Sequence, residues 1–172
     1  NGADSDIHKR IKVLMNELNI DSSILKVVEE AKKKEIKSKK RAMAIELDNG
    51  HIITGRETNL LSPAASLILN SIKYLTDIPD EIDLLSPNVL KPILKLKKEE
   101  LNGNSLLNLN EVLIALSICS ATNPMVKKAL KNLSKLKYCD CHATYIVENG
   151  DLSSLRSLLV NLTCEPIFYN EY

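Results

Sequence analysis

The sequence predicts a helix-rich α/β fold, in which an N-terminal β-hairpin and two C-terminal strands form a small mixed sheet flanked by about six helices. The first observation is Asp48-Asn49-Gly50, which tolerates positive φ between two apolar segments, 42–47 and 51–54. The second is the recurrence of Ser-Pro and Asn-Pro pairs before helical patterns, where a polar N-cap followed by proline is typical. The third is a pair of strand-like segments near the C-terminus.

The first 40 residues carry the pattern of a helical hairpin that precedes this fold. Over residues 5–19, apolar spacing places Ile7, Ile11, Leu14 and Leu18 on one helical face. Asp21-Ser22-Ser23 then supplies the N-cap of a second helix. We therefore expect an N-terminal helical hairpin or connector over 1–40 and an α/β domain over 41–172, together one globular unit that is a fragment of a longer protein.

A helix follows the hairpin almost at once. Alternation over 42–47 places Met43 and Ile45 on one face of the first strand and Ala44 on the other. Leu60-Leu61-Ser62-Pro63 then opens a helix that reaches about Thr76.

The same tetrapeptide recurs as Leu84-Leu85-Ser86-Pro87 and opens another helix, which Pro92 should end or kink. The residues after the two tetrapeptides do not match. We therefore attribute the recurrence to repeated capping chemistry and not to an internal repeat.

The second half of the chain returns to strands. Asn110 is the expected cap of a segment, 111–121, that is apolar nearly all round and is therefore predicted to be a central buried helix, although periodicity alone also allows a buried strand. Asn123-Pro124 opens the next helix. Strand 141–147 follows, then a short helix from Asn149-Gly150-Asp151, and last a strand over 162–168 whose Pro166 favours an edge position.

Composition excludes several classes of partner. The formal net charge of +1 gives no general attraction to nucleic acid or to a membrane surface. The basic stretch 32–41 has Glu29, Glu30 and Glu35 beside or within it, which favours a solvated helix end over a nucleic acid contact. No apolar run reaches the about 20 residues that span a bilayer, and no targeting peptide is recognisable. The four cysteines form no secretory framework, so we expect reduced thiols and a cytoplasmic location.

The first candidate site is the polar loop from Gly55 to Ser62, which leads into a helix N-terminus. Arg56 could pair with a phosphate or carboxylate, and Thr58 and Ser62 offer hydroxyl groups. Free amides at the helix start would add a partial positive charge. The alternative is that Gly55 makes a turn, Ser62 only caps the helix and Arg56 is solvated.

The second candidate pairs His142 with Thr144, which alternation places on one strand face. Asn123 and Glu165 come from neighbouring element ends and could join them, and a histidine can act as a base near neutral pH. The alternative is a structural, hydrogen-bonded histidine. We expect no metal, because a strand sends Cys141 and His142 to opposite faces and Cys139-Asp140-Cys141 lacks zinc-site spacing.

Four segments together give the chain a family resemblance. They are Asn49-Gly50-His51-Ile52-Ile53-Thr54-Gly55, Ser62-Pro63-Ala64-Ala65, Asn110-Glu111-Val112-Leu113-Ile114-Ala115-Leu116, and the ending from His142-Ala143-Thr144 through Asn161-Leu162-Thr163 to Glu165-Pro166. With these segments in this order, the chain from about Ile7 to Tyr169 resembles the C-terminal half of an uncharacterised bacterial family known as domain of unknown function 1846, or uncharacterised protein family 0371.

The resemblance implies a longer cytosolic protein whose N-terminal part carries a glycine-rich, phosphate-handling segment. Some members carry the label of ATP-dependent zinc protease, but this chain has no His-Glu-x-x-His motif. The expected function is that of a C-terminal module that binds a small anionic ligand and completes a site with the missing N-terminal domain. The alternative is a structural or homo-oligomerisation domain without a ligand of its own. The sequence leaves the cofactor unknown and does not decide whether a reaction is catalysed.

Overall fold

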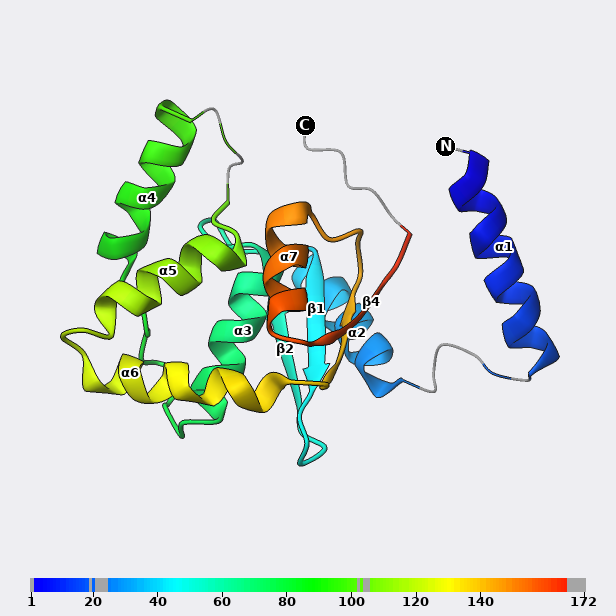
Figure 1. Ribbon diagram of the computed structural model, residues 1–172, viewed down its shortest axis with the longest axis horizontal. Coiled ribbons are helices and arrows are strands. Elements are labelled where there is room, and N and C mark those ends of the chain that lie inside the picture. The colour runs from blue at the N-terminus through cyan, green and yellow to red at the C-terminus, as the bar shows by residue number, and fades with distance from the viewer. Residues whose placement is uncertain (1, 19, 21–24, 102, 104–105, 167–172) are drawn as a thin grey trace.

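The computed structural model describes the whole chain except residues 1, 19, 21–24, 102, 104–105 and 167–172 (Figure 1). The described part contains both helices and strands, which confirms the predicted α/β class. In chain order the elements are α1 (Gly2–Glu17), α2 (Lys26–Ser38), β1 (Ala42–Glu46), β2 (Ile52–Arg56), α3 (Pro63–Tyr74), α4 (Pro87–Glu99), α5 (Leu109–Cys119), α6 (Pro124–Lys131), the 3-10 helix η2 (Asn132–Leu136), β3 (Asp140–Ala143), α7 (Asn149–Ser157) and β4 (Asn161–Cys164).

The four strands form one mixed sheet in the order β2-β1-β3-β4. β1 pairs antiparallel with both β2 and β3, whereas β3 and β4 run parallel. The predicted hairpin is confirmed: Gly50 has a φ of 76°, and the Leu47 amide donates to the His51 carbonyl at 2.9 Å across the turn. β4 lies at an edge, as the proline after it predicted.

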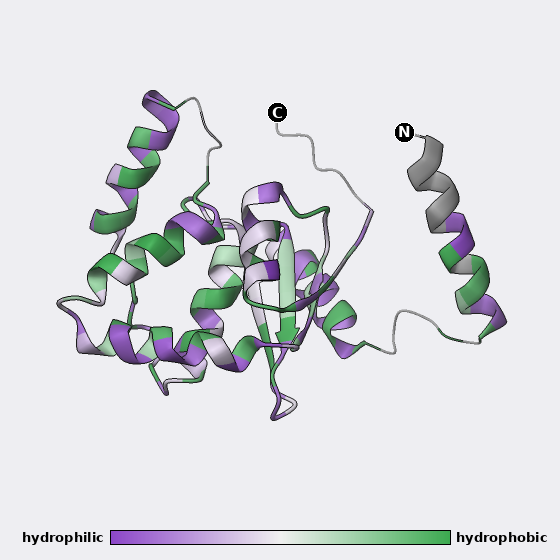
Figure 2. Cartoon of the chain, viewed as in Figure 1, coloured by the Kyte–Doolittle hydropathy of each residue, from purple (hydrophilic) through white to green (hydrophobic). Residues whose placement is uncertain are grey.

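The two faces of the sheet are covered by different helices. Met43 and Ile45 of β1 point into the main core, to which α3, α5 and α7 contribute. Ala44 points to the other face, where it packs against Val27 and Ala31 of α2. This arrangement confirms the alternation predicted for the first strand. Figure 2 shows hydrophobic residues concentrated on β1, α3 and α5, and mixed with polar residues on α2, α4 and α6.

Helix starts follow the predicted capping chemistry at two places. The Ser62 side chain accepts from the Ala65 amide, and the Asn123 side chain accepts from the amides of Met125 and Val126. The prediction of Asn110 as a cap is wrong, because the cap is Asn108. Asn108 forms a capping box with Glu111: each side chain accepts a hydrogen bond from the backbone amide of the other residue. A capping box needs Glu or Gln three residues after the cap, and Glu111 stands at this distance from Asn108 and not from Asn110.

Two helix predictions need correction. Of the two outcomes predicted for Pro92, an end of the helix is wrong, because α4 continues to Glu99; Pro92 itself is solvent-exposed, while Leu90 and Leu94 on the same helix are buried. α5 is not buried all round. Leu109, Val112, Ala115 and Leu116 are buried, but Ile118 is 70% exposed because that face of the helix has no covering element within the described residues.

The two C-terminal strands are shorter than predicted, and some predicted features fall outside the described residues. β3 ends at Ala143, four residues before the predicted Val147, and β4 ends at Cys164. Asp21-Ser22-Ser23, Phe168 and the Ile7 side chain lie outside the described part. The division of the chain near residue 40 stays a prediction; α2 packs directly on the sheet, whereas α1 stands apart from it in Figure 1.

Candidate functional site

The loop from Gly55 to Ser62 is held tightly between β2 and α3. Gly55 is buried, and a Cβ atom at this position would collide with the backbone of Leu67. Glycine therefore allows β2 to approach α3 closely. The Thr58 hydroxyl accepts from the amides of Leu60 at 3.2 Å and Leu61 at 2.9 Å, which fixes the loop from inside. These contacts therefore give the loop a defined conformation between β2 and α3.

Arg56 and Thr58 line a cavity of about 300 Å³, which we call the loop cavity. It lies between the loop, one side of α3 and the segment that leads into α4. Its apolar wall comes from leucines of these elements. Its polar and charged lining residues are Lys34, Arg56, Thr58, Ser66, Asn70, Lys73 and Asp83.

Three cations and one acidic side chain line the loop cavity, so its lining is positive. Lys73 is buried, and its ammonium donates to the Asp80 carbonyl at 2.8 Å. Arg56 is exposed and makes one long contact, 3.4 Å, to the carbonyl of its neighbour Glu57. Within the described residues, neither Arg56 nor Lys73 is in an ion pair with a carboxylate.

Ser66 is the most unusual residue of this lining. It is 7% exposed, and its hydroxyl has no hydrogen-bond partner among the described residues. A buried polar group without a partner is costly, and such groups are rare in native structures. Ser66 therefore offers the cavity an unused donor and acceptor.

A second, wider cavity of about 600 Å³ adjoins the first along the free edge of β2. Both share Lys34, Asn70 and Lys73. The second is bordered by His51 and Tyr74, whose rings stack with their centroids 4.3 Å apart. The wider cavity adds Asp77 and Asp80 to the two shared lysines, so the excess of positive charge is confined to the loop cavity.

Ser62 lies elsewhere. Its hydroxyl accepts from the Ala65 amide at 3.2 Å and donates to Oδ1 of Asp151 at 3.0 Å. Oδ1 of Asp151 also accepts from the Leu109 amide at 2.6 Å. This carboxylate therefore joins the N-termini of α3 and α5 to the first turn of α7.

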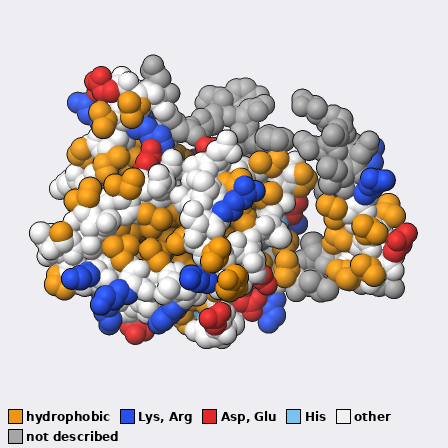
Figure 3. All heavy atoms as spheres, viewed as in Figure 1, with side chains coloured by type: hydrophobic (Ala, Val, Ile, Leu, Met, Phe, Trp, Pro, Cys, Tyr) orange, Lys and Arg blue, Asp and Glu red, His pale blue; other side chains and the backbone are white. Residues whose placement is uncertain are grey.

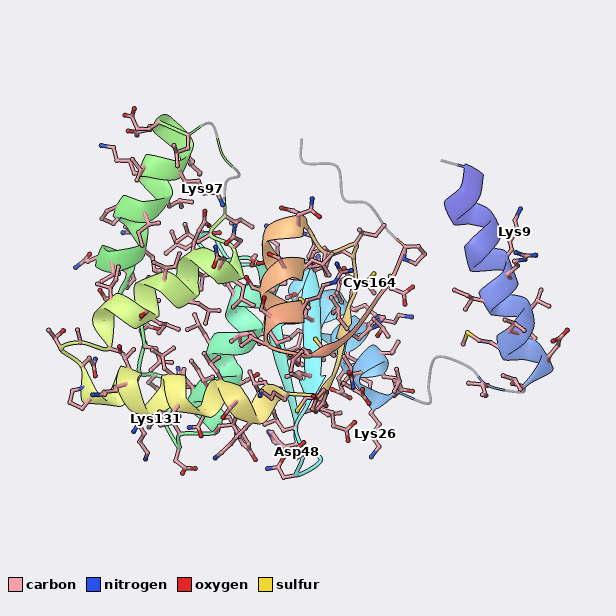
Figure 4. All side chains as sticks on the ribbon, in the orientation of Figure 1. Lys9, Lys26, Asp48, Lys97, Lys131 and Cys164 are labelled. Carbon is pink, nitrogen blue, oxygen red and sulfur yellow. The ribbon has the colours of Figure 1, made fainter. Side chains whose placement is uncertain are left out.

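The place where these three helices begin is a separate polar cavity of about 240 Å³, which we call the three-helix junction. Lys97 of α4 reaches into it and donates to the Leu106 carbonyl at 2.7 Å and to Glu111 at 2.9 Å (Figure 4). The lining residues are Arg41, Ser62, Lys97, Leu106, Asn108, Glu148, Gly150 and Asp151.

Arg41 forms one side of the junction and is tied to it by several contacts. It donates to Glu57 at 2.7 Å and to Glu148 at 3.2 Å, and its guanidinium carbon lies 5.0 Å from the centre of the Tyr145 ring. Burial acts to lower the pKa of Arg41, but the hydrogen bond and charge of Glu57 outweigh it and the pKa is raised. Burial raises the pKa of Asp151, although the Leu109 amide and the Ser62 hydroxyl act in the opposite direction.

His142 of β3 and Thr144, which directly follows the end of this strand, both lie on the side of the sheet that α2 covers. Nδ1 of His142 lies 2.9 Å from the Thr163 hydroxyl, and its Nε2 lies 3.6 Å from Glu165. The Thr144 hydroxyl donates to Glu35 of α2 at 2.8 Å. Burial lowers the pKa of His142, and the hydrogen bond from Lys32 lowers that of Glu165.

The predicted site residues therefore fall into separate places. Arg56 and Thr58 share the loop cavity, Ser62 lines the junction, and Gly55 packs against α3. Glu165 joins His142, whereas Asn123 caps α6. Sequence reasoning missed Ser66, because a serine within a helix carries no signal of its own. It also missed Asp151, whose only signal was an acidic residue in the first turn of a helix.

The four cysteines form no disulfide with one another. Cys141 points into the main core while its neighbour His142 lies on the opposite face of β3. Within the described residues, no group of three or more His, Cys, Asp or Glu side chains is placed to hold a metal ion.

The fold and its cavities define a helix-rich α/β domain with a four-stranded mixed sheet, helices on both faces and polar cavities at the helix starts. The chain belongs to the family described as "Domain of unknown function DUF1846, C-terminal", whose model matches residues 23–172. This confirms the resemblance found in the sequence.

The relatives are proteins of the uncharacterised family UPF0371. A UPF0371 protein of Clostridium tetani (strain Massachusetts / E88) is 39% identical over 98% of this chain, which covers 35% of the relative. One of Clostridium botulinum (strain ATCC 19397 / Type A) is 40% identical with the same coverage. The chain thus spans about a third of the length of the curated relatives it matches. Among the described helices, none has the length and apolar character needed to cross a bilayer.

Proposed function

We propose that this chain is the C-terminal module of a longer cytosolic bacterial protein and that it binds a small phosphate-bearing anion in the loop cavity. The observation that carries the proposal is that Arg56 and Lys73 line the same cavity as Ser66, whose buried hydroxyl has no hydrogen-bond partner in the described part of the chain. A phosphate oxygen could accept from all three groups, and hydrogen bonds between charged groups are the stronger ones.

The open shape of the loop cavity supports a binding site that another part of the protein completes. The cavity is partly open to solvent, exposed Arg56 is among its lining residues, and it shares three lining residues with the wider cavity along β2. Because the matched part is only 35% of the C. tetani relative, the unmatched part of that relative is about twice as long as this chain. In our proposal the rest of that polypeptide closes the open side over the anion.

Thermal unfolding with inorganic phosphate and pyrophosphate tests the binding. A ligand that binds only the folded state raises Tm with concentration, so we expect millimolar phosphate to raise Tm more than sodium chloride of the same ionic strength. Arg56→Ala should abolish the rise. Arg156→Ala, which removes an exposed arginine of α7, should leave it unchanged.

Ser66→Ala separates binding from folding. Because no described residue forms a hydrogen bond with this hydroxyl, its removal should not lower Tm without ligand, but it should weaken the response to phosphate. If no anion changes Tm at millimolar concentration, or if Arg56→Ala responds like the parent, the loop cavity is not an anion site. The C. tetani relative should bind phosphate more tightly than this chain if the rest of the polypeptide completes the site.

A second candidate function is assembly, and exposed apolar side chains favour it. Ile114 and Ile118 of α5 are 54% and 70% exposed, and Figure 3 shows hydrophobic side chains gathered over α5 and α6. The predicted stripe residues Ile11 and Leu14 of α1, and Leu18 directly after it, are also exposed. Contiguous apolar surface of this kind often marks a protein interface. Light scattering of the chain tests it: replacement of both isoleucines by lysine should dissociate any oligomer, and a parent that stays monomeric at high concentration excludes it.

A further inference from the structure

The starts of the three helices at the junction differ in how their amides are satisfied. The first amides of α3 and α5 have side-chain acceptors, Ser62 for α3 and Asn108 for α5. α7 begins after Glu148, whose side chain makes no capping hydrogen bond. The first turn of α7 therefore presents backbone N–H groups that have no side-chain acceptor among the described residues, and Arg41 lines the same cavity.

Asp151 supplies the opposite charge in the same cavity. It is 4% exposed, and both of its hydrogen bonds within the described residues use Oδ1. Its second oxygen, Oδ2, makes no hydrogen bond to any described residue. A carboxylate can accept about four hydrogen bonds, so this buried group retains unused acceptor capacity beside the cavity.

Two cations and two carboxylates line the junction. Arg41 and Lys97 are positive, with side chains only 11% and 12% exposed, and Glu148 and Asp151 are negative. Outside the lining, Glu57 also pairs with Arg41 and Glu111 with Lys97. An isolated anion would gain from the cations but would be repelled by the two carboxylates. A molecule that carries both signs at a short separation matches this lining better. The junction thus differs from the loop cavity, whose lining is positive.

Gly150 keeps the backbone of α7 accessible at this place. A Cβ atom here would come within 2.7 Å of the Asn108 side chain. A larger residue would therefore displace the Asn108 side chain, which caps α5. The volume of about 240 Å³ is below the roughly 300–1,000 Å³ usual for drug-sized ligands, so the occupant must be small.

We infer that the three-helix junction is a second site, for a small zwitterion of the α-amino-acid type. Its carboxylate contacts Arg41 and the first amides of α7, and its ammonium contacts Asp151. The inference stands independently of the loop cavity, with which the junction shares no lining residue. An arriving ammonium would also favour the charged form of Asp151, whose pKa burial raises.

Amide NMR of the labelled chain, titrated in turn with each of the common α-amino acids, tests the inference. At least one should shift the amide signals of Leu109 and Gly150 in a saturable way. Acetate, which has only the carboxylate, and ethylamine, which has only the ammonium, should shift these signals far less at the same concentration. Asp151→Asn should weaken the binding about tenfold or more while Tm changes little, because its amide oxygen can still accept from Ser62 and Leu109.

Three results would overturn the inference. They are the absence of any saturable shift with the whole panel, equal shifts with acetate alone, and unchanged binding by Asp151→Asn. Arg56→Ala serves as the control and should bind the amino acid like the parent. Because that same variant should lose the phosphate response, failure of one site can be told apart from failure of the other.

Discussion

The hydroxyl of Ser62 donates a hydrogen bond of 3.0 Å to Oδ1 of Asp151, which lies 89 positions further along the chain. The contact is buried at both ends. It fixes the start of α3 against the start of α7, while the same carboxylate oxygen holds the first amide of α5. The side chain of Asp151 thus links the N-termini of three helices.

This relationship predicts strong coupling between the two residues. Asp151→Ala would leave the Ser62 hydroxyl and the Leu109 amide without their acceptor, so we expect a loss of about 1–3 kcal/mol in the free energy of unfolding. Urea unfolding of Ser62→Ala, Asp151→Ala and the double variant measures the coupling. Losses that simply add would contradict a shared hydrogen bond.

Gly55→Ala should destabilise the protein because a Cβ atom would strike the backbone of Leu67. Overpacking of this kind typically costs about 1–3 kcal/mol. Gly50→Asn is the matched control: its φ of 76° suits asparagine, and no atom lies within 4 Å of the added Cβ. Urea midpoints compare the two variants, and similar values for both would show that β2 and α3 can move apart.

Pro92→Ala should stabilise α4. Proline within a helix removes one backbone hydrogen bond and costs about 3 kcal/mol in a helix interior, and Pro92 is exposed, so no packing is lost. We expect a higher Tm by differential scanning calorimetry, with Pro87→Ala at the first helical position as a control that brings no gain. A lower Tm for Pro92→Ala would indicate that the proline ring has a packing role.

His142 should make stability depend on pH. Burial lowers its pKa, so the unfolded chain takes up a proton more readily than the folded protein. The contribution of His142 is therefore complete above its unfolded pKa of about 6.5 and declines as the pH falls toward the lower folded pKa. Urea unfolding between about pH 8 and 5.5 should show this decline. His142→Asn should flatten it and His51→Asn should not; an unchanged slope in His142→Asn would assign the effect to another group.

Local chemistry made the hairpin and most helix starts predictable. Positive φ at Gly50, the Ser62-Pro63 and Asn123-Pro124 pairs, and the alternation of β1 each depend on a few neighbouring residues. Where two local signals competed, sequence reasoning chose wrongly: Asn110 looked like a cap, but the capping box with Glu111 selected Asn108. The apolar character of 111–121 likewise gave no sign that Ile118 would face outward, since exposure depends on which elements pack around a helix.

The sequence alone determined the kinds of element, the family and the polar character of the loop at 55–62. Only the tertiary structure decided which of those polar groups meet. It turned Ser62 toward Asp151, placed Arg56 beside Ser66 and Lys73, and covered His142 with α2. The physical reason is that caps and turns are satisfied within a few residues, whereas a cavity is formed by side chains that packing brings together from distant parts of the chain.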